Sequence, residues 1–298
     1  MESGEATELL GDLASQQWGL FTSAQARDLD IKTPDLLRLE KAGVLERVRH
    51  GVYAITGTAL SAVIELKAQW LAIRPDMMAA DRLRDEALAK EAVVSHTTAA
   101  DLWGIGDLWP DGYHFTVEKR RRSRQPEVHF HRADLEDGAW AIHKGTGLPI
   151  TTVPRTIADL ADAGHEAEHL TSLVSDAGNK NLVTRTELFE ALYGKETALG
   201  LNTGDEDGLR TLLADRLGTY DFDPRIAQAI DLSLQPIRES FSGIAQAIWS
   251  DTMMSNELKL AMKHATKAMN QSFSTGKNAD QILRQALRNT PRAAEEND

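Results

Sequence analysis

Residues 32–56 carry the pattern that most constrains what this chain can fold into. A helix is predicted over residues 34–42, with Thr33 as a candidate N-cap, Pro34 at the first helical position and Gly43 where a helix commonly ends. Directly after it, "VLERVRHGVYAIT" alternates apolar and polar residues on both sides of a glycine, as the two strands of a hairpin do. A helix followed at once by a short hairpin is typical of the second half of a winged helix-turn-helix.

Two further helices are predicted before this pattern. Apolar residues recur at helical spacing in the first of them, at Leu9, Leu10, Leu13 and Ala14. The second begins after Thr22 and Ser23 in "FTSAQARDLDI", where either hydroxyl can cap it. Three helices and a two-stranded wing predict a winged helix-turn-helix domain over residues 1–58. In such a domain the third helix enters the major groove of DNA and the wing reaches the phosphate backbone or the minor groove.

The polar residues of the third helix and the wing are the candidate DNA contacts. We expect Leu36, Leu37 and Leu39 to pack inward, which leaves a set of polar and mostly basic residues for DNA: Lys32, Thr33, Arg38, Lys41, Arg47, Arg49 and His50. Arg47 and Arg49 are expected on one face of their strand. This local excess of cations stands out because the whole chain of 298 residues has a net charge of −12. Winged helices also bind proteins, so a protein-interaction module is the alternative.

The segment "GLFTSAQARDLDIKTPDLLRLEKAGVLERVRHGVYAI" resembles the N-terminal domain of AbiEi-type antitoxins of type IV toxin–antitoxin systems. That family runs from a G-x-x-T/S-x-x-x-A start to a closing R-x-x-x-G-V-Y. Three later segments are also similar to the family: "AVVSHTTAADLWGI" to the helix after the wing, "YHFTVEKRRRSRQPEVHFHRADL" to its central hairpin, and "GLPITTVPRTIADLAD" to the stretch before its later helices. The resemblance covers residues 8–195.

The resemblance implies a cytoplasmic antitoxin that is also a transcriptional autorepressor. Its partners would be operator DNA in its own promoter and a cognate AbiEii-type nucleotidyltransferase toxin, whether bound directly or opposed indirectly. Self-association on DNA is left open. We expect no enzymatic activity and no cofactor. The alternative is a stand-alone winged-helix transcription regulator without a toxin partner.

Residues 59–200 are predicted to form an α+β domain around a small mixed sheet. Ser95 is a candidate cap for a helix over residues 96–103, and strands follow in "YHFTVEK" and "EVHFHR". Alternation along the second strand places His129 and His131 on one outward face. Two histidines could chelate a metal ion, but no third ligand is evident nearby in the sequence, so we expect a solvated, partly cationic face.

Between these strands lies the densest charge cluster of the chain, in "KRRRSRQP". We call residues 119–126 the basic loop; its cations are Lys119, Arg120, Arg121, Arg122 and Arg124. Five cations so close together repel one another, and an anionic partner would relieve that repulsion. DNA, the toxin and the toxin's RNA substrate are the candidates, and a loop kept polar for solubility is the alternative.

One motif points to metal-dependent hydrolysis. The run from His165 to His169 is a formal H-E-x-x-H, in which two imidazoles could hold zinc while Glu166 activates water. Gly164 places the motif at a helix start, and a third ligand would have to come from Glu187 or Glu190. We therefore expect exposed helix-start residues and no metal, and keep a zinc hydrolase as a third hypothesis. The chain has no cysteine, which excludes thiolate catalysis and cysteine-ligated zinc.

The remaining features complete a fold of the α+β class that is mostly helical. Arg155 and Asp159 are predicted to form an ion pair within one helix. Residues 201–298 are predicted to be an all-helical extension, whose helical patterns follow the linker segment "LGLNTGDEDG". We expect its apolar stripes to pack internally, and self-association or toxin docking is the alternative. No apolar run of about 18 residues is present that could span a membrane, and the N-terminus does not resemble a signal peptide.

Overall fold

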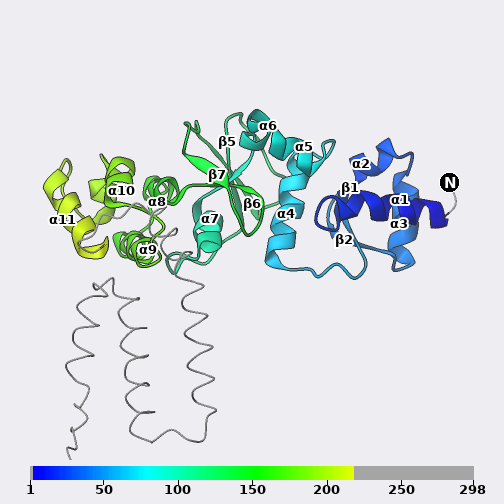
Figure 1. The fold of residues 1–298 in the computed structure, drawn as a ribbon, viewed down its shortest axis with the longest axis horizontal. Coiled ribbons are helices and arrows are strands. Elements are labelled where there is room, and N and C mark those ends of the chain that lie inside the picture. The colour runs from blue at the N-terminus through cyan, green and yellow to red at the C-terminus, as the bar shows by residue number, and fades with distance from the viewer. Residues whose placement is uncertain (1–2, 218–298) are drawn as a thin grey trace, which may run out of the picture. The chain divides into compact units, whose positions relative to one another are not determined.

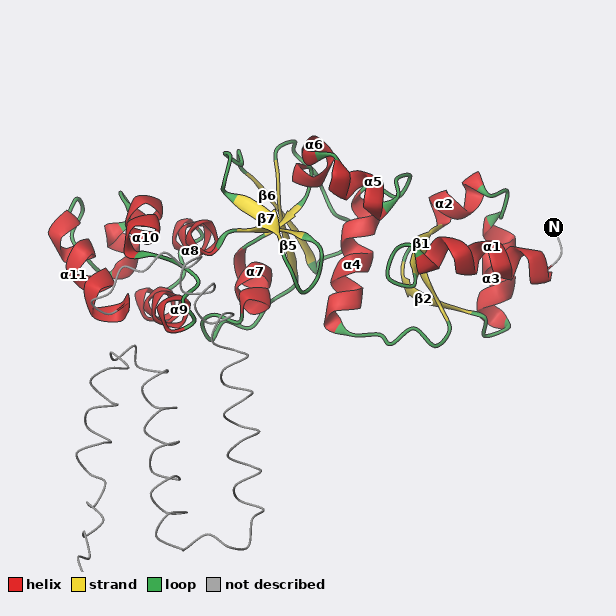
Figure 2. Cartoon of the chain, in the orientation of Figure 1, coloured by secondary structure: helices red, strands yellow, loops and turns green. Residues whose placement is uncertain are grey.

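The structure is a computed structural model that describes residues 3–217 (Figures 1 and 2). They belong to one compact unit of the chain. Most of the predicted helical extension lies outside the described residues. The architecture is α+β with small mixed sheets, which confirms the predicted class. The domain boundaries at residues 58 and 200 stay a prediction.

The N-terminal region is a winged helix-turn-helix. Strand β1 precedes the second helix and joins the wing in a three-stranded antiparallel sheet of order β1-β3-β2. At the wing turn, Gly51 has a φ of 78°, a conformation that glycine adopts without strain. The elements are α1 (Ser3–Ser15), β1 (Leu20–Thr22), α2 (Ser23–Asp28), α3 (Thr33–Lys41), β2 (Leu45–Arg49) and β3 (Val52–Ile55).

Two details of α3 differ from the prediction. The N-cap is Lys32, not Thr33, because the Lys32 backbone is extended and Thr33 is already helical; the Lys32 N–H donates to the carboxylate of Asp35 at 3.3 Å. The helix therefore begins one residue earlier than expected. Leu37 is 41% exposed although it was expected to pack inward. Successive helical residues are turned by about 100°, so the narrow buried stripe that holds Leu36 and Leu39 leaves Leu37 outside.

The second region is built on a five-stranded mixed sheet of order β6-β5-β4-β8-β7. The pairs β5/β6 and β4/β8 are parallel, whereas β4/β5 and β7/β8 are antiparallel. The strands and the helices that precede and connect them are α4 (Ala62–Ile73), α5 (Ala79–Arg84), α6 (Glu86–Lys90), β4 (Val93–Val94), α7 (His96–Trp103), β5 (Tyr113–Val117), β6 (Val128–Arg132), β7 (Trp140–Ile142) and β8 (Pro149–Thr151).

The expected hairpin between the two longest strands of this sheet is wrong. β5 and β6 run parallel, with His114 opposite His129 and Thr116 opposite His131. Parallel strands cannot be joined by a tight turn, so the basic loop between them is a crossover connection. This register places His114 on the same face of the sheet as His129 and His131.

A helical region follows the sheet and has its own hydrophobic core. Leu160, Leu173 and Leu188 are fully buried there, and Leu209 and Leu213 of the last described helix pack among them. The elements are α8 (Val153–Asp162), α9 (Ala167–Asn179), α10 (Arg185–Leu192), the 3₁₀ helix η1 (Glu196–Leu199) and α11 (Glu206–Leu217). No helix within residues 3–217 is long and apolar enough to cross a membrane.

One core joins the winged helix to the mixed sheet. Val52 and Ala54 of the wing pack in the same cluster as Trp70 of α4, Phe115 of β5 and Ile150 of β8. The opposite face of the wing belongs to the core of the winged helix itself. Strand β3 is therefore buried on both faces, and it holds the wing against the sheet region.

Candidate nucleic-acid interface

The exposed face of α3 carries the predicted basic residues. Lys32, Thr33, Arg38 and Lys41 are all exposed. Arg38 forms an ion pair with Asp35 at 3.2 Å, but its side chain is 70% exposed. Because a pair in such contact with water contributes little energy, the guanidinium remains available to a phosphate or a base.

The alternation along β2 predicted Arg47 and Arg49 on one face of the strand. This prediction is wrong. A β-bulge lies between Arg47 and Arg49, so that Arg47 is opposite Tyr53 and Arg49 is opposite Val52. One extra residue in a strand reverses the side on which the next side chain points. Arg47 is exposed and contacts the exposed ring of His50, with 2.7 Å between Nη2 and Nδ1.

Arg49 turns toward the sheet region and is only partly exposed. Its Nη2 donates to Oε1 of Gln125 in the basic loop, and its Nε has no hydrogen-bond partner. Burial lowers the pKa of Arg49, while the nearby Glu127 opposes that shift. The contact with Gln125 brings together the wing and the basic loop, which are about 70 residues apart in the sequence.

Four of the five cations in the basic loop remain exposed: Lys119, Arg120, Arg122 and Arg124. The fifth, Arg121, faces inward, where it donates to Glu91 at 3.2 Å and to the carbonyl of Ile73 at 3.0 Å. Arg121 thus anchors the loop, and the exposed cations on either side of it are presented to solvent.

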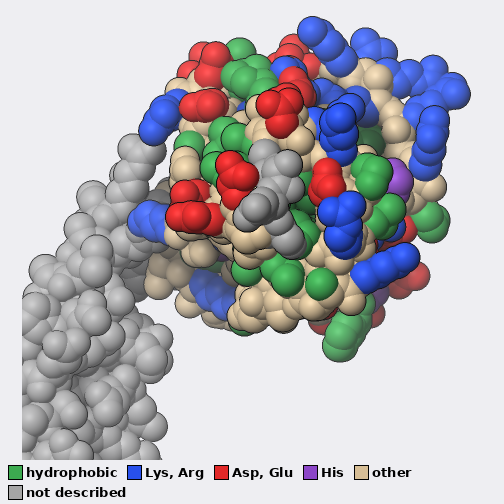
Figure 3. All heavy atoms as spheres, turned by 90° about the vertical axis from the view of Figure 1, so that its right-hand side faces the viewer, with side chains coloured by type: hydrophobic (Ala, Val, Ile, Leu, Met, Phe, Trp, Pro, Cys, Tyr) green, Lys and Arg blue, Asp and Glu red, His purple; other side chains and the backbone are tan. Residues whose placement is uncertain are grey.

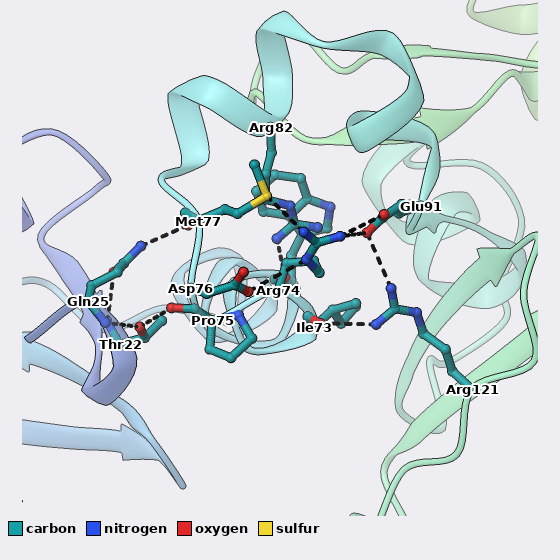
Figure 4. A network of polar contacts seen from close by, with 11 residues as sticks. Thr22, Gln25, Ile73, Arg74, Pro75, Asp76, Met77, Arg82, Glu91 and Arg121 are labelled. Carbon is teal, nitrogen blue, oxygen red and sulfur yellow. Dashed lines mark hydrogen bonds and ion pairs between the residues drawn. The ribbon is translucent and has the colours of Figure 1, made fainter. Parts of the chain in front are cut away.

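Figure 4 shows how this anchor continues toward the winged helix. Glu91 also accepts two hydrogen bonds from Arg74, at 2.7 and 2.9 Å. In the segment after Arg74, the carbonyl of Pro75 accepts from Thr22 at 2.5 Å, and that of Met77 accepts from Gln25 at 2.8 Å. Polar contacts therefore link the start of α2 to the basic loop through the end of α4.

Figure 3 views the molecule from the side of the winged helix. Lysine and arginine side chains gather toward one edge of this face, and aspartate and glutamate side chains gather toward the other. A molecule with a net charge of −12 thus separates its charges on this face. Because salt screens charges beyond about 10 Å, cations grouped at one edge act on an anion largely independently of distant acidic residues.

Four histidines meet on the mixed sheet, and this cluster was not predicted from the sequence. His129 and His131 share a face as expected, but His114 of β5 and His96 of α7 lie beside them. The expectation that no third metal ligand is near His129 and His131 is therefore wrong. The alternation of "YHFTVEK" places His114 on the opposite face of its strand from Phe115 and Val117, but its position opposite His129 depends on how β5 pairs with β6.

The H-E-x-x-H motif lies at a helix start, as expected. Glu166 is the N-cap of α9, so His165 precedes the helix. His169 is bound by Asp107 at 2.9 Å, which raises the pKa of the imidazole. Within residues 3–217, the groups of three side chains close enough to share a metal ion all lie in the histidine cluster on the sheet. The predicted ion pair of Arg155 with Asp159 is confirmed, at 2.7 Å.

The fold of the N-terminal region and the basic face of its third helix define a winged helix-turn-helix protein. Residues 8–56 match the family model described as "Transcriptional regulator, AbiEi antitoxin". This match confirms the resemblance to the AbiEi antitoxin family over this range. The family is one of regulators and antitoxins, and not of enzymes.

Comparison with solved structures finds the RV2827C protein from Mycobacterium tuberculosis. The two chains are 18% identical, the match covers 72% of this chain and 82% of the other, and the TM-score is 0.45. No curated protein sequence matches the chain.

Proposed function

We propose that this protein is an antitoxin and a transcriptional autorepressor, which binds operator DNA in its own promoter and counteracts an AbiEii-type nucleotidyltransferase toxin. The family of the winged helix domain supports a regulator or antitoxin role. The observation that best supports the DNA-binding part of the proposal is the hydrogen bond between Arg49 and Gln125. It joins the wing to the basic loop, so that cations from two distant segments lie on adjoining surfaces.

The contacts of the candidate residues give them different roles in this proposal. Lys32, Thr33, Arg38 and Lys41 on α3 would contact base edges and phosphates in the major groove. Phosphate contacts outside that groove would come from the wing and the basic loop, through Arg47, His50, Lys119, Arg120, Arg122 and Arg124. Arg49 and Arg121 would act as positioning residues, since both are engaged within the protein.

Removing cations that bind phosphates should flatten the salt dependence of operator binding. We expect the triple variant Arg120→Ala, Arg122→Ala, Arg124→Ala to reduce the slope of log K against log salt by roughly 0.9 for each phosphate that is no longer neutralised. Arg47→Ala should act in the same way at a single phosphate. By contrast, Arg38→Ala should also relax sequence preference, by about 1–3 kcal/mol at the affected base pair. Affinities for operator and unrelated DNA, measured by fluorescence anisotropy across a salt series, test all three variants.

A matched control is Arg84→Ala, which removes an exposed arginine on α5 whose partner is the surface residue Asp81. Its operator affinity and salt slope should equal those of the unchanged protein. Equal slopes for the triple variant and this control would contradict a role of the basic loop in DNA binding.

The antitoxin part of the proposal is tested together with the toxin gene. Coexpression with a neighbouring nucleotidyltransferase should restore growth that the nucleotidyltransferase alone arrests. Equal toxicity with and without this protein would contradict the antitoxin role. If operator binding persisted in that case, the protein would be a stand-alone winged-helix regulator.

A further inference from the structure

The four-histidine cluster brings together three secondary-structure elements. His114 lies on β5, His129 and His131 lie on the parallel neighbour β6, and His96 is the first residue of α7. The rings of His96 and His131 are stacked with their centroids 3.5 Å apart. His96 also has a φ of 52°, which is uncommon for a residue other than glycine. Such conformations persist only where the surroundings hold them in place, and they concentrate at functional sites.

Three of these imidazoles can reach a common point. His96, His114 and His131 each offer a ring nitrogen, and these atoms lie within 4.8 Å of one another. Nδ1 of His114 and Nε2 of His131 are already 2.9 Å apart. Ligand nitrogens of a tetrahedral zinc ion are about 3.3 Å apart when the Zn–N distance is about 2.0–2.1 Å. The three nitrogens are therefore close enough to share one ion, and the stacked rings would turn to direct their in-plane lone pairs toward it.

Hydrogen bonds from outside the four histidines hold the second ring nitrogen of two of the proposed ligands. Nε2 of His114 is bound by a carboxylate oxygen of Asp111 at 2.7 Å, which leaves Nδ1 facing His131. Nδ1 of His96 is bound by Ser95 at 2.9 Å, which leaves Nε2. A histidine that binds a metal ion almost always donates its other ring N–H to a carboxylate, a carbonyl or a water, which fixes the tautomer.

The surroundings also favour the protonation state that a metal ion needs. His96 and His114 are buried, and His131 is half-buried. Burial lowers the pKa of His96 to about 3 and of His131 to about 4, and it lowers the pKa of His114 despite the opposing effect of Asp111. Burial thus favours the neutral ring, which is the form of imidazole that binds metal ions.

We propose that His96, His114 and His131 bind one divalent transition-metal ion, such as Zn²⁺, through one ring nitrogen each, and that Asp111 orients His114. Three imidazole ligands suit zinc, nickel or copper better than magnesium or calcium, which prefer oxygen. Such an ion would link the first turn of α7 to both parallel strands. The proposal goes beyond the proposed function and does not depend on DNA binding.

A second set of ligands, Asp111, His114 and His129, is also close enough to share an ion. It competes with the first set because both need His114. We favour the three-histidine set, since its members are more buried and since Asp111 is then free to hold the second nitrogen of His114.

Zinc titration of the full-length protein tests the proposal. Protein without a polyhistidine tag is stripped with a chelator and titrated with Zn²⁺ by calorimetry, and bound zinc is counted by mass spectrometry after dialysis. We expect one zinc ion per chain and a thermal unfolding midpoint that rises with zinc concentration. His131→Gln should weaken zinc binding at least about 100-fold, and Asp111→Asn should weaken it by roughly 10–100-fold.

Two variants serve as matched controls. His169→Gln removes a histidine of the H-E-x-x-H motif, and His129→Gln removes the histidine that only the second set uses. Both should bind zinc as the unchanged protein does. Asp111 is exposed, so Asp111→Asn keeps the test decisive if circular dichroism shows that His131→Gln does not fold.

Three results would overturn the proposal. The first is the absence of stoichiometric zinc binding to the unchanged protein at zinc concentrations up to about 100 µM, a range that detects any site of useful affinity. The second is loss of zinc in His129→Gln with retention in His131→Gln, which would assign the ion to the second set. The third is loss of zinc in His169→Gln alone, which would assign it to the H-E-x-x-H motif.

Discussion

Replacing Trp70 by alanine is expected to lower the free energy of unfolding by about 3–5 kcal/mol, the range for removing a large aromatic side chain from a core. Trp70 is fully buried in the core that joins the winged helix to the sheet. Its indole N–H donates to the carbonyl of Ala92 at 2.9 Å, and its ring packs edge-on against Trp18 at 6.3 Å between centroids. The substitution would therefore leave a cavity and an unpaired carbonyl.

A buried cation makes this loss larger. The guanidinium of Arg82 is buried and lies 3.4 Å from the centre of the Trp70 ring. Nη1 of Arg82 donates to the Trp70 carbonyl at 2.8 Å, but its Nε and Nη2 have no hydrogen-bond partner. Burial lowers the pKa of Arg82 to about 9, although the negative charge of Glu91 opposes that shift, so the group is charged at pH 7. The Trp70 ring also stabilises this charge, and its removal would leave the buried guanidinium with less compensation.

Urea unfolding followed by circular dichroism measures this effect. The matched control is Trp109→Ala, because the Trp109 side chain is 91% exposed and its loss should change stability by less than about 0.5 kcal/mol. Equal stabilities of the two variants would show that Trp70 does not hold the winged helix to the sheet. The operator affinity of Trp70→Ala should also fall, since the wing loses its support.

Acid is expected to destabilise the metal-free protein through the histidine cluster. His96 and His131 are neutral in the folded protein down to about pH 3 and pH 4, whereas in the unfolded chain they take up protons near their ordinary pKa of about 6.5. Below pH 6.5 the unfolded chain thus binds more protons, and stability falls as the pH falls. Above pH 6.5 these groups have no such effect.

The size of the effect follows mainly from His96, because burial lowers its pKa to about 3. His96 is 8% exposed, and lowering the pH to 4.5 should cost about 2–3 kcal/mol of stability through this residue. Burial also lowers the pKa of His114, but the carboxylate of Asp111 opposes this shift because it favours the protonated ring. The window from pH 6.5 to about pH 4 is therefore where His96 and His131 act together.

Urea unfolding in the presence of a chelator, repeated from pH 7.5 to pH 4.5, measures this dependence. His131→Gln should flatten the fall in stability between pH 6.5 and pH 4.5. His169→Gln is the control, since Asp107 raises the pKa of His169 and its removal cannot flatten that fall. An unchanged slope in His131→Gln would show that the imidazoles of the cluster are not kept neutral by the fold.

Local features of the helices and of the wing could be predicted from short stretches of the sequence. Thr22 caps α2 as predicted, the helix His96–Trp103 follows Ser95, and Gly51 turns the wing. Caps, turns and apolar periodicity act over a few residues, so short stretches of sequence are enough to specify them. The positive charge of the basic loop could also be predicted, because it follows directly from the residue types in that segment.

Tertiary structure alone decided which of these residues meet. One bulge turned Arg49 away from Arg47 and toward Gln125, and a parallel pairing of β5 with β6 brought His114 beside His129 and His131. Strand register and direction depend on how whole faces pack against a core, and not on the residues of one strand. The sequence therefore specified the helices, the wing and the charges, while the packing of distant segments created the anchored basic surface and the histidine cluster.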